Sequence, residues 1–176
     1  MGNAHTAAPP VVNKGRKVVK GVTYDSETGE ITDCIFCNIR DKREPANILL
    51  ENEEFVVFKT IKPAVPTLHA LVCPKKHVQS LASLRGKSGA DLVRRMVDTG
   101  KDTLRQQGMD VDDVQFCFHV PPYNSIDHLH LHVIATPRQM SLKNMIKYFP
   151  STYWCQQAMQ VIRDLERPRI KRSARE

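Results

Sequence analysis

The sequence predicts one folded domain in which a long helix packs on a sheet of β-strands. Residues 88–106 place apolar side chains on one face and charged ones on the others, the pattern of an amphipathic helix. Strands are indicated by short β-branched and aromatic runs and by alternating apolar and polar residues, at 48–50, 55–58, 69–73, 114–120 and 128–134.

Composition is that of an ordinary soluble globular protein, with 41% apolar and 26% charged residues among 176. No window reaches the apolar length of a membrane span, and the N-terminus lacks the apolar core of a signal peptide. The five cysteines are an odd number, which favours reduced thiols or metal ligands over a disulfide framework. We therefore expect a cytoplasmic protein.

Basic residues concentrate toward the two ends. Residues 1–20 hold four basic residues and no acid, and residues 167–176 hold five basic residues and one acid. We expect 1–30 to be a disordered basic tail, 31–166 the folded domain and 167–176 a second basic tail. Since the net charge of +7 belongs to the tails, charge alone does not predict a nucleic-acid-binding domain.

Two short signals lie in these tails. Met1 to Thr6 fits the myristoylation pattern with Gly2 as the acceptor, and Lys14 to Lys20 would supply the basic patch that one acyl chain needs for membrane contact. The alternative is a plain disordered tail. Lys171-Arg172 would suit nuclear import.

Cys34 and Cys37 form a C-x-x-C pair, which binds metals or performs redox chemistry. Redox use is typical of a βαβ setting, which the sequence does not indicate here. A zinc site would need two further ligands, and otherwise these are two small buried thiols. His69 and His77 are by default surface or satisfied core residues.

Ser88 is expected to cap the long helix and Gly108 to end it. The strand at 114–120 and the one at 128–134 are close enough in sequence to form a hairpin. Its connection, 121–125, would bring His119 and the hydroxyl of Ser125 beside the second strand.

His128, His130 and His132 alternate with apolar residues in that second strand. Because side chains alternate between the faces of a strand, the three imidazoles would share one face and Leu129 and Leu131 would enter the core. Three imidazoles in a row indicate a site for an anion or a metal. The alternative is a polar strand face without a function.

A neutral imidazole is a nucleophile that can attack phosphorus and form a covalent phospho-imidazole. Neighbouring imidazoles and a serine hydroxyl would bind the phosphate oxygens, and a protonated imidazole would give a proton to the leaving group. The rival interpretation is a metal-bound histidine cluster, which would need ligands from another element.

The segment His128–Ile134 resembles the signature of the histidine triad superfamily, and the resemblance extends over about residues 34–136. His119 to Asp127 is similar to the loop in the third branch of the histidine triad nucleotide-binding proteins, and aprataxin has a related loop. Three more segments resemble the opening segment, the ribose-side strand and the helix entry of the family: 35–39, 58–63 and 74–77.

This resemblance implies an α+β fold with a five-stranded antiparallel sheet, one long helix and shorter helices, often in a homodimer with a continuous ten-stranded sheet. It implies hydrolysis of adenosine 5'-phosphoramidates or adenylates to release AMP, with no cofactor in catalysis. His130 would be the nucleophile that carries the adenylyl group, His132 and Ser125 would contact the phosphate, and His128 would support them. The nucleotide-binding residues implied are Ile35, Phe36, Ile39, Phe58, Thr60, Ile61, His119 and Asn124, although each apolar one also reads as core.

Two residues depart from the family pattern. Thr60 stands where an aspartate usually holds the ribose hydroxyls, and His119 stands where the best-known branch has asparagine. In some members a structural zinc is held at the positions of Cys34, Cys37, His77 and His128. Two other functions stay open: an aprataxin-like DNA-5'-adenylate hydrolase, and a nucleotide-binding or scaffold protein without catalysis.

Overall fold

The computed structural model describes residues 15–167. The predictions for Gly2 and for Lys171-Arg172 lie outside the described residues. Within them, none of the helices has the length and apolar character needed to cross a bilayer.

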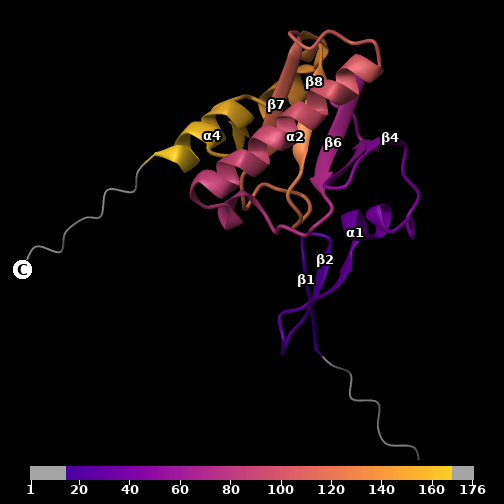
Figure 1. Ribbon diagram of the computed structural model, residues 1–176, viewed down its shortest axis with the longest axis vertical. Helices are drawn as coiled ribbons and strands as arrows, with labels where there is room; N and C mark the ends of the chain where they lie inside the picture. Colours follow the sequence, from indigo (N-terminus) through magenta and orange to yellow (C-terminus); the bar gives the residue numbers. More distant parts are fainter. Residues whose placement is uncertain (1–14, 168–176) are drawn as a thin grey trace, which may run out of the picture.

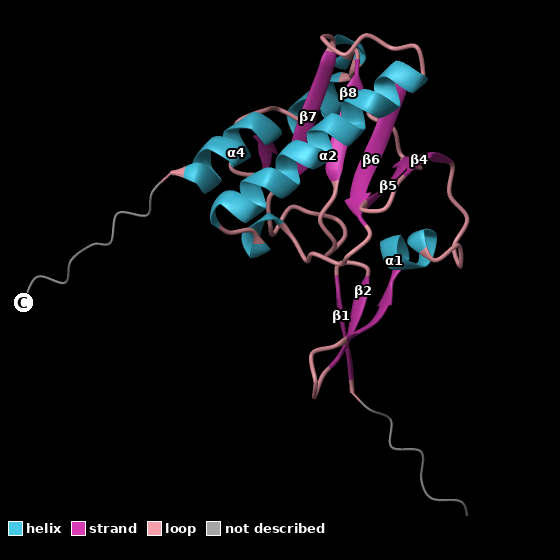
Figure 2. Ribbon diagram, in the orientation of Figure 1, coloured by secondary structure: helices cyan, strands magenta, loops and turns pink. Residues whose placement is uncertain are grey.

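The main sheet is antiparallel and has six strands in the order β4-β5-β6-β8-β7-β9 (Figures 1 and 2). Five strands were expected from the resemblance, and that number was wrong. The sixth is β9, a short strand near the C-terminus that pairs with the outer edge of β7. The strands are β4 (Ile48–Glu51), β5 (Phe55–Lys59), β6 (Leu68–Pro74), β7 (Val114–His119), β8 (Leu131–Ala135) and β9 (Cys155–Gln157).

A second, three-stranded sheet is built by β1 (Arg16–Val19), β2 (Val22–Asp25) and β3 (Ile31–Cys34). Residues 15–30 are therefore not the disordered tail that the sequence predicted. The β1–β2 turn is made by Lys20 and Gly21, whose φ angles of 46° and 70° are those of a tight two-residue hairpin turn. Figure 1 shows this small sheet and α1 standing below the main sheet.

The helices are α1 (Ile35–Arg40), α2 (Gly86–Gln106), α3 (Leu142–Lys147) and α4 (Ala158–Glu166), with 3₁₀ turns at Leu81–Ser83 and Pro137–Gln139. The long helix was predicted, but its start was not. Arg85 is the N-cap residue of α2, and Ser88 lies inside the first turn, where its hydroxyl donates to the Arg85 carbonyl.

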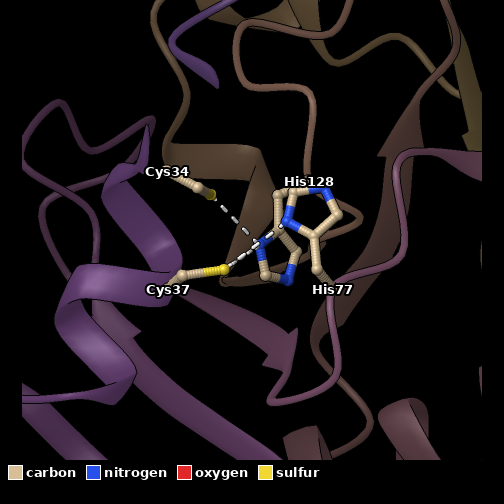
Figure 3. A group of neighbouring side chains, drawn as sticks. All are labelled: Cys34, Cys37, His77 and His128. Atoms are coloured by element: carbon tan, nitrogen blue, oxygen red, sulfur yellow. Dashed lines mark hydrogen bonds between the residues drawn. The ribbon is translucent and has the colours of Figure 1, made fainter. Parts of the chain in front are cut away.

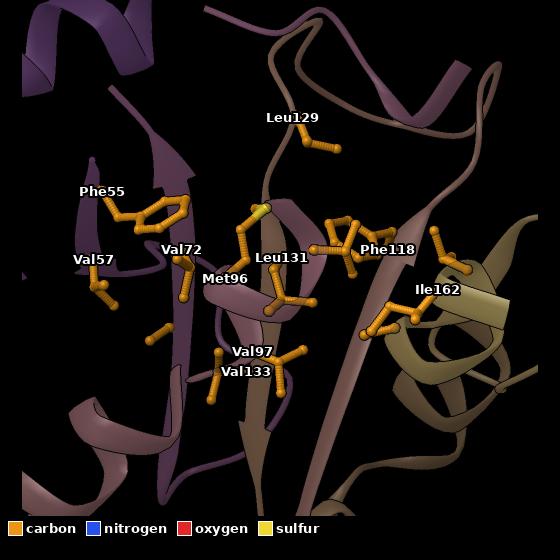
Figure 4. Close-up of a cluster of buried hydrophobic side chains, with 14 of the residues drawn as sticks. Phe55, Val57, Val72, Met96, Val97, Phe118, Leu129, Leu131, Val133 and Ile162 are labelled. Carbon is orange, nitrogen blue, oxygen red and sulfur yellow. The ribbon is translucent and has the colours of Figure 1, made fainter. Parts of the chain in front are cut away.

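The hydrophobic core lies between the sheet and the two helices α2 and α4 (Figure 4). Met96 and Leu104 of α2 meet Leu131 and Val133 of β8 in this cluster, and all four are fully buried. At Gly100 an added Cβ would lie 2.9 Å from the Phe116 ring and 3.0 Å from Val133. The glycine thus allows α2 to approach β7 and β8 closely.

The pairing of β6 with β8 decides which side chains face away from α2. His69 lies opposite Ile134 and Leu71 lies opposite His132 in this register. Because paired residues point to the same side of a sheet, His69 and His132 share the face opposite the helix. This face carries the polar site.

Replacing Leu104 by Ala should lower the free energy of unfolding by about 2–5 kcal/mol, since a fully buried side chain would leave a cavity under α2. Leu142→Ala is the control, because Leu142 is 74% exposed and its loss should cost less than about 0.5 kcal/mol. Urea unfolding of both variants measures the difference, and equal values would contradict this description of the core.

Candidate functional site

The three histidines of the 128–132 segment are all buried on one side of the chain. The strand predicted for 128–134 begins only at Leu131, so His128 and His130 precede β8. The alternation is kept nonetheless, because Leu129 and Leu131 enter the core next to α2. The imidazoles of His130 and His132 meet edge to face, with their centroids 5.0 Å apart.

His130 has a defined tautomer. Its Nδ1 lies 2.7 Å from the carbonyl oxygen of His128, and a carbonyl can only accept, so Nδ1 carries the hydrogen. The other nitrogen, Nε2, therefore keeps its lone pair. Burial lowers the pKa of His130 to about 4, so this lone pair is free at neutral pH. This arrangement leaves Nε2 of His130 available either to accept a hydrogen bond or to attack an electrophile.

His132 has the opposite tautomer because of His69. The Nδ1 of His69 accepts from the Ala64 amide at 2.9 Å, so the His69 hydrogen is on Nε2, which donates to Nδ1 of His132 at 2.9 Å. The hydrogen of His132 is then on Nε2, a buried atom without a hydrogen-bond partner among the described residues. Burial lowers the pKa of both rings, that of His69 to about 3.

A buried donor without a partner is costly unless a ligand or water satisfies it. The Nε2–H of His132 therefore indicates an acceptor, such as a phosphate oxygen, in the bound state. His69 orients this donor and was not predicted as a site residue. Its partner depends on the register of β6 with β8, which residue spacing alone does not provide.

An aromatic wall adjoins the triad on the side of α1. The ring of Phe36 lies 5.3 Å from those of His130 and Phe58, and Ile39 is buried in the same cluster. Ile35 is half-buried beside it. Such a wall suits a flat base.

The structure does not bring every predicted nucleotide-binding residue into this wall. Ile61 is 96% exposed in the turn after β5, so it lines no enclosed pocket. Thr60 is half-buried, and its amide donates to the His69 carbonyl. The ribose contact predicted for Thr60 stays a prediction.

On the other side of the triad, His119 lies 4.8 Å from His132 between ring centroids and donates from Nε2 to the Lys147 carbonyl at 3.3 Å. Tyr148 contacts both rings. Ser125 is exposed, and the hydrogen bonds of the described residues do not join it to the triad. Its phosphate contact stays a prediction.

The loop before the triad is held by the N-terminal hairpin. The ammonium of Lys20 donates to the carbonyl and to the side-chain oxygen of Asn124, each at 2.9 Å, and to the carbonyl of Pro122. The carboxylate of Asp127 accepts from the Tyr24 hydroxyl at 2.6 Å. This support was not predicted, since residues 15–30 show no sustained pattern.

Cys34, Cys37, His77 and His128 form a group that could hold a metal ion (Figure 3). One ligand atom from each lies within 4.8 Å of all the others. These residues come from the end of β3, from α1, from the segment after β6 and from the triad. The structure thus brings together the four residues that the resemblance implied.

The tautomer of His128 fits a metal ligand. Its Nε2 donates to the Pro74 carbonyl at 3.0 Å, which leaves the lone pair on Nδ1, 3.4 Å from the Cys34 sulfur. His77 likewise directs Nδ1 toward the Cys37 sulfur at 3.5 Å. His128 thus donates its other nitrogen to a carbonyl, as a ligating histidine usually does, whereas Nε2 of His77 is buried without a partner among the described residues. Two sulfurs and two imidazoles are the donor set of a structural zinc site.

Comparison with known proteins decides the family. A family model described as "Scavenger mRNA decapping enzyme C-term binding" matches residues 33–148, about two thirds of the chain and all three triad histidines. The chain belongs to this family, within the histidine triad superfamily.

Relatives and solved structures agree. The adenosine 5'-monophosphoramidase HINT3 of Xenopus tropicalis is 38% identical over 148 residues, which cover 83% of this chain and 95% of that protein. The mouse protein of the same name is 42% identical over 134 residues, 74% of this chain and 76% of that one. A histidine triad protein from Clostridium difficile has a TM-score of 0.55 and 28% identity, covering 60% of this chain and 92% of its own.

The hydrogen positions derived above are testable. At neutral pH we expect His130 as the Nδ1–H tautomer and His69 and His132 as Nε2–H tautomers, because the partner of Nδ1 in each ring decides whether that atom donates or accepts. Long-range ¹H–¹⁵N correlation spectra of the ¹⁵N-histidine-labelled protein distinguish the two forms. An Nε2–H tautomer or an imidazolium at His130 would contradict the derivation.

Proposed function

We propose that this protein hydrolyses adenosine 5'-phosphoramidates and related adenylates, breaking the P–N bond and releasing AMP. The observation that carries the proposal is the pair of complementary imidazoles. The lone pair of His130 Nε2 stands beside the unsatisfied Nε2–H of His132. A nucleophile next to a hydrogen-bond donor is what attack on a phosphoryl group requires.

The reaction proceeds in two steps. His130 Nε2 attacks the α-phosphorus, and the amine leaves with the electron pair of the P–N bond and takes a proton from water. A water molecule then attacks the adenylyl-histidine, which releases AMP and returns the neutral imidazole. Splitting the displacement in this way lowers the barrier of each step.

His132 acts as a hydrogen-bond donor in this mechanism. Its pKa lies well below the usual value because of burial, so it holds no extra proton at neutral pH to give away. Its Nε2–H instead contacts a phosphate oxygen whose charge grows in the transition state. The predicted role of a protonated imidazole as proton donor therefore finds no support in these pKa shifts.

The adenine base is proposed to lie against Phe36 and Phe58, whose rings meet at 5.3 Å beside His130. An aromatic ring can bind a flat base by stacking or by an edge-to-face contact. The relatives named adenosine 5'-monophosphoramidase support an adenosine substrate, since the match spans 95% of the Xenopus protein. We also propose the cytoplasm as its location, where unpaired thiols stay reduced.

His130→Ala should lower turnover of adenosine 5'-monophosphoramidate by about 10³-fold or more, because the nucleophile is lost. Affinity for AMP should change much less, since the aromatic wall remains. Intact mass after a rapid quench should show an adenylyl adduct in the wild type and none in the variant. Gln107→Ala, at the far end of α2, is the control and should keep full activity.

Unchanged turnover in His130→Ala would overturn the mechanism. Hydrolysis of a 5'-adenylated oligonucleotide, with steep salt dependence and no reaction of the phosphoramidate, would replace this function by the DNA-adenylate alternative.

We further propose that the metal group binds one structural zinc ion and that zinc supplies stability rather than a catalytic step. Zinc would join the N-terminal sheet and α1 to the triad segment, since Cys34 and Cys37 lie on one side and His128 on the other. Metal analysis should find about one zinc per chain, and Cys34→Ser/Cys37→Ser should lose it, along with several degrees in Tm.

Cys117→Ser is the matched control, since Cys117 is a buried thiol outside the metal group. It should keep its zinc. Wild-type protein that takes up no zinc from a zinc-supplemented medium would sink the proposal.

A further inference from the structure

The side of the triad next to α3 is strongly cationic. Lys147, the last residue of α3, places its ammonium 5.0 Å from the centroid of the Tyr148 ring. That ring contacts His69, His119 and His132 edge to face or tilted, and the Lys147 carbonyl accepts from His119. One aromatic ring therefore separates the Lys147 ammonium from the triad.

Two more lysines converge on Lys147. Lys143 lies one turn earlier in α3, and residues four apart share a helix face. Asn144 donates to the carbonyl of Ala64 at 2.9 Å, which ties the loop of Lys62 to the same helix. Burial, then Lys62 and Lys143, lower the pKa of Lys147, which agrees with three cations held close together.

Acidic residues do not offset these charges. The chain has no Asp or Glu between positions 55 and 90, or between 128 and 163, and these stretches supply β5, β6, β8 and α3. Asp127, directly before the second stretch, is buried and accepts from Tyr24 and Gln79. Among the described residues, the ion pairs leave out Lys62, Lys143 and Lys147.

Unpaired surface lysines often form no more than a solvated face. Here like charges repel one another, which is unfavourable unless an anion binds between them. A cluster of this kind beside a phosphoryl-transfer site attracts anions and raises their local concentration. In the proposed mechanism His130 and His132 contact the α-phosphate, so the lysines are free to bind another anionic group.

We propose that Lys62, Lys143 and Lys147 form a leaving-group subsite, and that this enzyme prefers adenosine phosphoramidates and adenylates whose leaving group carries an anionic oxygen group such as a carboxylate, phosphate or sulfate. The inference rests on the proposed function. When the substrate is a phosphoramidate, His130 Nε2 bonds to phosphorus and the electron pair of the P–N bond goes to the amine nitrogen. That nitrogen takes a proton from water. The lysines hold the departing anion and take no part in bond breaking.

Two matched substrates test the subsite: the adenosine 5'-phosphoramidates of β-alanine and of β-alaninamide. They share the P–N bond and the chain length and differ by one negative charge. The wild type should prefer the β-alanine substrate by about tenfold in kcat/KM, the range of a few charge-assisted contacts. Lys143→Gln/Lys147→Gln should reduce that ratio to about twofold or less, and Lys62→Gln should reduce it in part.

Lys101→Gln is the control, since it removes one positive charge from α2 on the opposite face of the sheet and should keep the ratio. A wild-type ratio near one, or a ratio that the lysine variants leave unchanged, would overturn the subsite while leaving the proposed function intact. Failure of the wild type to hydrolyse either substrate would instead overturn the proposed function.

Discussion

The antiparallel pairing of β6 with β8 determines both the hydrophobic core and the polar site of the molecule. On one face of the sheet it presents Leu131 and Val133 to α2, and on the other it sets His69 beside His132. A shift of one residue would exchange the two faces and place imidazoles in the apolar core. The register that builds the core is thus the same register that defines the hydrogen on His132.

Burial gives the site neutral imidazoles with assigned hydrogens. A ring shielded from water resists protonation, and each ring then needs an acceptor for its single N–H. His130 uses the backbone of His128, His128 uses Pro74, and His119 uses Lys147. Among the described residues, two buried imidazole nitrogens lack a hydrogen-bond partner, Nε2 of His77 in the metal group and Nε2 of His132 in the triad. The His132 N–H lies beside His130, where a substrate oxygen would accept it.

Sequence patterns predicted those features of the structure that depend only on residues close together in the chain. The alternation at 128–133 predicted which side chains enter the core, because any extended chain alternates. The C-x-x-C spacing indicated Cys34 and Cys37 as possible metal ligands, and the resemblance supplied the two histidines. His69 escaped prediction because its role depends on a partner 63 positions away. The hairpin at 15–25 escaped it because its strands are short and its main signal is one turn at Lys20-Gly21.

The pairing of β9 with β7 limits how a second copy of the chain could extend the main sheet. A continuous ten-stranded sheet in a homodimer was expected by resemblance, and it stays a prediction. Since β9 pairs with Cys117, Phe118 and His119, that half of the β7 edge is already occupied by the chain itself. A second copy that extends the main sheet would meet β9 or β4 at its edges instead.

Segments on both sides of the histidine segment in sequence reach the triad, Lys20 through the loop before it and Lys147 and Tyr148 through His119. During synthesis the histidine segment therefore leaves the ribosome before the residues that enclose it on one side. Removal of the segment around Lys20, or of α3 with Tyr148, would for the same reason disturb the triad rather than the periphery of the molecule.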